Sequence, residues 1–161
     1  MDSDSGISEG LKVGDTFPSF KLQNENGDMF DSSDMSGKRY VVYFYPKDNT
    51  SGCTREAKDF TAALPTLSEM GVEVIGVSKD SSKSHRNFID KQELGFGLLS
   101  DPEHILMEKV GAWGTKISYG KETTGTIRST FVVGTDGRIE RIWKNVRVAG
   151  HVDKVVDFLK G

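Results

Sequence analysis

The chain has very little cysteine, since Cys53 is the only one among 161 residues. A single cysteine excludes an internal disulfide, so the domain is not held together by a disulfide framework. Apolar runs are also short, and none approaches the roughly 18 residues that a membrane-spanning helix needs. The sequence has no recognisable signal-peptide segment. We therefore expect a cytoplasmic protein in a reducing compartment, with no membrane partner.

An excess of basic residues is absent too. Lysine and arginine number 21 against 24 aspartate and glutamate residues, which gives a formal net charge of -3. Such a chain presents no basic field for nucleic acid. With 35% hydrophobic residues it can bury roughly two thirds of its unfolded surface in one compact domain. We expect a flexible tail over residues 1–10, rich in Asp, Ser and Gly, and a single domain over residues 11–161.

The apolar pattern predicts strands that alternate with helices. Strands are expected at residues 40–45, 72–77, 130–133 and 138–143, together with an N-terminal β-hairpin around the turn at 24–28. Helices are expected from Cys53 to about Met70, at 82–93, after Asp101 and Pro102 as N-cap and first residue, and at 150–159. Pro65 should kink the first helix or divide it in two. The order predicts an α/β fold, in which a mixed central sheet with a parallel βαβ unit has helices on both sides.

Cys53 lies where a buried aromatic strand gives way to a helix. A lone cysteine in a folded protein is most often a small buried hydrophobic residue. The neighbours of Cys53 are instead Thr, Ser, Gly, Thr and Arg, which is the composition of a site and not of a core. In the first turn of a helix, unpaired backbone N–H groups and the positive end of the helix dipole favour a thiolate. The sequence therefore indicates a cysteine placed for chemistry.

The motif around Cys53 resembles a known family. Pro46-x-x-x-Thr50-x-x-Cys53 is similar to the peroxidatic signature of the peroxiredoxins, which have a thioredoxin-like fold. Similar motifs of the branch called bacterioferritin comigratory protein, or peroxiredoxin Q, are found at residues 44–48, 52–57, 76–78, 98–101 and 113–114. Two positions depart from that branch: Ser51 stands where many members have proline, and Lys58 where many carry a resolving cysteine.

The resemblance implies an antioxidant thiol peroxidase that reduces hydrogen peroxide or organic hydroperoxides. Cys53 would be the nucleophile and become a sulfenic acid. The resemblance implies that the Thr50 hydroxyl hydrogen-bonds to the thiolate and the peroxide, and that Pro46 shields the sulfur from water. It further implies that backbone N–H groups around Gly52 and Cys53 donate to a peroxide oxygen, and that Arg128 keeps a permanent cation beside the thiolate and the peroxide. It implies no metal and no cofactor.

The absence of a second cysteine calls for an external thiol reductant, such as thioredoxin or glutaredoxin with glutathione. We expect a monomer or a weak dimer. Two other functions remain open at this point. The first is a monothiol oxidoreductase that acts on mixed disulfides, and the second is a thioredoxin-like binding module with an inert cysteine.

Several other residues have simpler interpretations. The three histidines, His85, His104 and His151, are far apart without a metal-ligand pattern, so we expect them at the surface or at helix ends. Trp113 and Trp143 are expected to be packing residues. Glu56 could orient Arg128, but we prefer a role at the helix N-terminus, where a negative charge is favourable.

Overall fold

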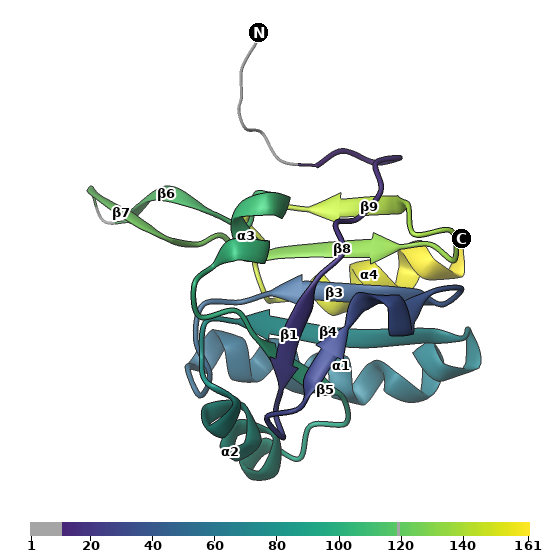
Figure 1. The fold of residues 1–161 in the computed structure, drawn as a ribbon, viewed down its shortest axis with the longest axis horizontal. Coiled ribbons are helices and arrows are strands. Elements are labelled where there is room, and N and C mark those ends of the chain that lie inside the picture. The colour runs from purple at the N-terminus through teal and green to yellow at the C-terminus, as the bar shows by residue number, and fades with distance from the viewer. Residues whose placement is uncertain (1–10, 119) are drawn as a thin grey trace, which may run out of the picture.

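Within the described residues, 11–118 and 120–161, the computed structural model has a seven-stranded mixed sheet flanked by helices (Figure 1). The strands run in the order β2-β1-β5-β4-β3-β8-β9. They are β1 (Lys21–Asn24), β2 (Met29–Asp31), β3 (Arg39–Phe44), β4 (Val72–Ser78), β5 (Gly97–Ser100), β8 (Ser129–Val133) and β9 (Ile139–Trp143). The helices are η1 (Ser32–Met35), α1 (Ser51–Glu69), α2 (Ser82–Gln92), α3 (Ile105–Val110) and α4 (His151–Lys160).

The central strand β3 is apolar throughout because it is buried on both faces of the sheet. Val41, Tyr43 and Tyr45 pack with α1, α2 and α4 on one face. Val42 and Phe44 pack with α3 and the N-terminal segments on the other. Successive side chains of a strand alternate between the two faces, so one short segment supplies both cores. The predicted mixed sheet with helices on both sides is confirmed.

The βαβ unit that carries Cys53 also has the expected topology. β3 and β4 are parallel neighbours, and α1 connects them. β8 pairs with the other side of β3 in antiparallel register, with Phe44 opposite Ser129. The end of β3 therefore lies beside the start of β8, although about 85 residues separate them in sequence. The predicted hairpins β1–β2 and β8–β9 and the closing helix are confirmed as well.

The structure excludes one of the two alternatives for Pro65 and corrects the start of another helix. α1 is one helix that includes Pro65, so it is not divided in two. α3 begins at Ile105 with His104 as N-cap, so neither Asp101 nor Pro102 has the predicted position. The Asp101 carboxylate still caps this helix, because it accepts hydrogen bonds from the N–H groups of Ile105 and Met107 across the intervening turn.

A second small sheet was not foreseen. β6 (Trp113–Ser118) and β7 (Lys121–Thr126) form an antiparallel hairpin that extends beyond the main sheet (Figure 1). β7 is polar and largely exposed, so it lacks the apolar alternation from which strands are recognised. The predicted tail over residues 1–10 lies outside the described residues. Among the helices that the structure describes, none is long and apolar enough to cross a bilayer.

Replacing Pro65 with Ala should stabilise the protein. Pro65 is exposed in the interior of α1, where proline removes a backbone hydrogen bond and costs up to about 3 kcal/mol relative to alanine. Greater freedom of the unfolded chain offsets part of the gain. We expect P65A to raise the free energy of unfolding by about 1 to 2 kcal/mol in urea denaturation. Pro102→Ala, outside any helix, is the control and should bring no gain; an equal gain there would contradict the explanation.

Candidate functional site

Cys53 is the third residue of α1, so the predicted position in the first turn is confirmed. Thr50 is the N-cap, and its carbonyl accepts the first helical hydrogen bond from the N–H of Thr54 at 2.8 Å. The first N–H groups of a helix have no partner within the helix and point past its N-terminus. The Cys53 side chain is only 2% exposed and packs with Ala57 and Phe60. The thiol is thus buried against the core at the positive end of a helix.

Arg128 lies directly against this thiol. Its Nη2 donates to the Cys53 Sγ at 3.3 Å, and its Nη1 donates to Glu56 Oε1 at 2.6 Å. Arg128 immediately precedes β8, and the pairing of β8 with β3 brings it to the end of β3 from which the Cys53 loop begins. Burial lowers the pKa of Arg128, but the neighbouring Glu56 and Cys53 outweigh it and raise the pKa overall. The guanidinium therefore remains a cation beside the sulfur.

Glu56 is the carboxylate that holds Arg128. Its side chain is fully buried, and Oε2 makes no hydrogen bond to any residue that the structure describes. Burial raises the pKa of Glu56 to about 7, although Arg128 acts in the opposite direction. The preferred interpretation of Glu56 as a helix N-terminal charge is wrong. Glu56 lies beyond the first turn of α1, and its carboxylate instead contacts Arg128.

Three other residues were predicted for the site, Thr50, Pro46 and Gly52. Among the described residues, the hydrogen bond to the Cys53 sulfur comes from Arg128 and not from these three. The Thr50 hydroxyl donates to the Lys47 carbonyl at 2.8 Å and does not cap the helix. Pro46 is half-buried directly after Tyr45 at the end of β3. At Gly52, an added Cβ would lie 3.5 Å from Arg128 Nη2, so this glycine borders the guanidinium.

The three histidines lie near helix starts, which is one of the two expected positions, surface or helix end, but His85 and His151 are buried. His85 is fully buried in the first turn of α2, with Nδ1 2.8 Å from Asp48 Oδ2. His151 begins α4 but is also buried, with Nε2 2.8 Å from Thr130 Oγ1. Burial, followed by the charges of Lys154 and Arg128, lowers the pKa of His151 to about 4. Sequence analysis missed the buried Asp48–His85 contact, because the two residues are 37 positions apart and follow no motif with a known spacing.

The two tryptophans have the expected packing roles. Trp113 stacks on the His104 ring with centroids 3.9 Å apart, at the base of the β6–β7 hairpin. Trp143 packs edge-on against His151 and Phe158 of α4. These contacts join the start of α3 to the β6–β7 hairpin and α4 to β9 of the main sheet.

The geometry agrees with what comparison to known proteins shows. Residues 13–142 match the model of the AhpC/TSA family. A putative peroxiredoxin bcp of Helicobacter pylori is 43% identical over 151 residues, which cover 94% of this chain and 99% of that protein.

Two solved structures are similar over nearly their whole length. Peroxiredoxin Q of Xanthomonas campestris is 39% identical, covers 95% of this chain and 98% of its own, and superposes with a TM-score of 0.85. The bacterioferritin comigratory protein of the same organism, described through its alkyl peroxide reduction activity, is 38% identical over 94% and 98% of the two chains, also with a TM-score of 0.85. The chain therefore belongs to the AhpC/TSA family and, within it, to the bacterioferritin comigratory protein or peroxiredoxin Q branch of the peroxiredoxins, which are thiol peroxidases of thioredoxin-like fold.

Proposed function

We propose that this chain reduces hydrogen peroxide and organic hydroperoxides with Cys53 as the nucleophile. The observation that carries the proposal is the Arg128 guanidinium 3.3 Å from the Cys53 sulfur at the N-terminus of α1. The thiolate attacks one peroxide oxygen, the O–O bond breaks, and Cys53 becomes a sulfenic acid. The second oxygen leaves as hydroxide or alkoxide and, through solvent, takes up the proton that the thiol released on ionising. The family relationship favours this reaction over a monothiol oxidoreductase or an inert binding module.

Arg128 has two tasks in this proposal. As a fixed cation it favours the thiolate over the thiol, and it can donate to an oxygen on which charge grows as the O–O bond stretches. Charge of this kind is stabilised most strongly by donors that are already oriented before the reaction begins. The hydrogen bond to Glu56 at 2.6 Å supplies that orientation, because it fixes one side of the guanidinium and leaves Nη2 facing Cys53.

Thr50, Gly52 and Pro46 complete the proposed site. The N–H groups of Gly52 and Cys53 belong to the first turn of α1 and would donate to a peroxide oxygen. The Thr50 hydroxyl would rotate from the Lys47 carbonyl toward the bound peroxide, since an O–H group turns freely about its C–O bond. Pro46 would limit the approach of water from the β3 side. Each of these three roles rests on position and on the family motif.

The catalytic cycle needs a peroxide and a thiol reductant, and we infer that the reductant is external. One thiol attacks the Cys53 sulfenic acid and releases water, which forms a mixed disulfide. A second thiol then releases Cys53 in reduced form. Thioredoxin, or glutaredoxin with glutathione, has the required chemistry. We further propose a monomer or weak dimer in the cytoplasm, where such thiols are kept reduced.

Replacing Cys53 with Ser should abolish peroxide reduction and leave the fold intact. The exchange is nearly isosteric, but a serine hydroxyl is hardly ionised at neutral pH. We expect residual peroxidase activity below about 1% of wild type, together with an unchanged circular dichroism spectrum. Activity above a few per cent would contradict the assignment of Cys53 as the nucleophile.

The oxidised protein should form no covalent dimer. After one equivalent of hydrogen peroxide, intact mass spectrometry should show a gain of one oxygen, about 16 Da, on Cys53. After addition of glutathione it should show a mixed disulfide. A dominant Cys53–Cys53 dimer on a non-reducing gel would mean that reduction takes place between two chains, and it would overturn the single-cysteine cycle.

Replacing Glu56 with Gln should remove a pH-dependent loss of stability. The pKa of Glu56 is about 7 in the folded protein, against 4.5 for an exposed carboxyl, so the folded state holds this proton more tightly. The stability that this tighter proton binding adds to the folded state is fully present below about pH 4.5 and is lost as the pH rises through 7. The amide of E56Q cannot ionise and can still accept from Arg128. We expect the stability of E56Q relative to wild type to increase by about 3 kcal/mol between pH 4.5 and 8 in urea denaturation.

Glu69→Gln provides the matched control, because Glu69 is exposed at the end of the same helix. Its stability difference from wild type should stay constant with pH. If the stability difference between E56Q and wild type were also constant with pH, the pKa of Glu56 would be the same in the folded and unfolded chains, and the prediction would be wrong.

A further inference from the structure

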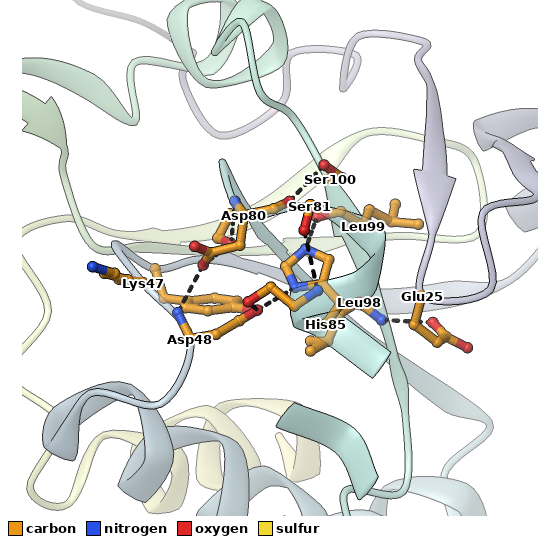
Figure 2. Close-up of polar contacts among 12 residues, drawn as sticks. Glu25, Lys47, Asp48, Asp80, Ser81, His85, Leu98, Leu99 and Ser100 are labelled. Carbon is orange, nitrogen blue, oxygen red and sulfur yellow. Dashed lines mark hydrogen bonds and ion pairs between the residues drawn. The ribbon is translucent and has the colours of Figure 1, made fainter. Parts of the chain in front are cut away.

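A buried polar network holds the loop that precedes Cys53, and Asp48 is its centre (Figure 2). Asp48 Oδ1 accepts from the Tyr45 hydroxyl at 2.6 Å. Asp48 Oδ2 accepts from the Ser84 hydroxyl at 2.8 Å and faces His85 Nδ1 at 2.8 Å. The backbone N–H of Asp48 donates to Asp80 Oδ2 at 2.7 Å. Both the backbone and the side chain of this loop residue are therefore fixed.

The His85 ring lies between two hydrogen-bond acceptors. Its Nε2 is 2.9 Å from the carbonyl oxygen of Leu99 on β5, and its Nδ1 faces the Asp48 carboxylate. A carbonyl oxygen can only accept, so Nε2 must carry a proton. The Asp48 carboxylate already accepts from Tyr45 and Ser84, as expected of the ionised form. The remaining hydrogen bond then requires a proton on Nδ1 too, which makes the ring an imidazolium.

The network controls the backbone on which the reaction depends. Asp48 is followed by Asn49, whose φ of +64° lies in the left-handed region, and then by Thr50, the N-cap of α1. A strained residue keeps such a conformation only where its surroundings fix the chain on both sides. The chain is fixed after Asn49 by α1 and before it by the contacts of Asp48. Any shift of Asp48 would pass through Asn49 to the N-terminus of α1, where Cys53 lies.

We propose that His85 is a doubly protonated positioning residue, which fixes the loop before Cys53 through Asp48 and ties it to α2 and β5. The inference rests on the proposed peroxidase function, because it concerns the placement of Thr50 and of the first-turn N–H groups relative to peroxide. His85 does not touch the substrate. It acts through the geometry of the loop, where a displacement of about 1 Å can cost roughly 100-fold in rate.

The same three residues, Asp48, Asp80 and His85, are close enough to share a metal ion. Their hydrogen bonds argue against that use. Asp80 Oδ2 accepts from the Asp48 N–H and the Ser78 hydroxyl, and both oxygens of Asp48 accept from hydroxyl groups. A cation between them would face the positive ends of these donors. The cluster is therefore better explained as a hydrogen-bonded support.

Two substitutions of His85 separate its two contacts. The amide nitrogen of Asn can take the place of Nδ1 and donate to Asp48, whereas that of Gln takes the place of Nε2 and donates to Leu99. If the Asp48 contact positions the loop, His85→Gln should lower the stopped-flow rate constant with hydrogen peroxide by roughly 10- to 100-fold. His85→Asn should recover at least half of that loss on a logarithmic scale. His104→Gln, at the start of α3, is the control and should react as fast as wild type.

Alkylation of Cys53 by iodoacetamide distinguishes positioning from general loosening. The rate of alkylation by iodoacetamide depends on the fraction of Cys53 that is thiolate and on the accessibility of its sulfur. It does not depend on the groups that would bind the peroxide oxygens. In His85→Gln the rate of alkylation should stay within about threefold of the wild-type rate, while the rate of oxidation by hydrogen peroxide falls. A peroxide rate for His85→Gln that equals or exceeds that of His85→Asn would overturn the proposal, as would faster alkylation that accompanies the loss. Slow peroxide reduction by wild type and His104→Gln alike would instead count against the proposed function.

The protonation state can be tested in the wild-type protein, which avoids any effect of substitution on folding. Heteronuclear NMR of a histidine-labelled sample at pH 7 should show one-bond N–H correlations for both ring nitrogens of His85. A single correlation at Nε2, with Nδ1 unprotonated, would overturn the imidazolium assignment.

Discussion

The structure of the site depends on one cation, the Arg128 guanidinium, which joins the Cys53 sulfur to the Glu56 carboxylate. Arg128 reaches this position because β8 pairs with β3 in a register that sets Ser129 opposite Phe44. The loop from β3 then turns into α1 within a few residues, and Cys53 arrives in its first turn. Strand pairing thus brings together two residues that are 75 positions apart.

This arrangement has a cost in stability. Glu56 is fully buried, and one of its carboxylate oxygens has no hydrogen-bond partner among the described residues. A buried ion pair seldom stabilises a fold more than well-packed apolar residues of the same size. We propose that a contribution to reactivity explains why such a pair occurs beside the thiol. In this proposal the Glu56 carboxylate keeps the guanidinium turned toward Cys53 during the reaction, and oriented charge is the largest source of catalysis in many enzymes.

A second support holds the loop before Cys53. Asp48 connects the segment before Cys53 to α2 through His85 and to the β4–α2 turn through Asp80. In the proposed account Cys53 is thus placed through two sets of contacts, those of Arg128 and those of the Asp48 network. The two supports use different residues and different elements. This separation allows the charge beside the sulfur and the position of the backbone to be perturbed independently.

Much of the fold could be predicted from the sequence, because local patterns determined it. The apolar run of β3, the helical face after Cys53 and the turn before Arg138 each indicate one element. The β6–β7 hairpin could not be found in this way, since the polar, exposed β7 carries no apolar pattern. Pro65 was expected to kink α1 or to divide it in two, and tertiary packing of the apolar face keeps the helix continuous.

The site was predictable only in part for a related reason. Cys53, Thr50, Gly52 and Pro46 are adjacent in sequence and form a motif. Arg128 could be selected through the family resemblance alone. The partners of Glu56 and His85 depend on tertiary contacts across 72 and 37 positions, for which a single sequence gives no physical signal.

The most direct test of this account is the stopped-flow rate constant for oxidation of reduced Arg128→Met by hydrogen peroxide, compared with wild type and with Arg128→Lys. Methionine fills similar space but removes the cation, so we predict a loss of roughly 100-fold, the size typical for one preorganised electrostatic donor. Lysine keeps the charge but cannot donate to Cys53 and Glu56 in the same fork geometry, and its rate should lie between the other two. A loss in Arg128→Met smaller than about threefold would show that the guanidinium beside the sulfur is not what makes Cys53 reactive.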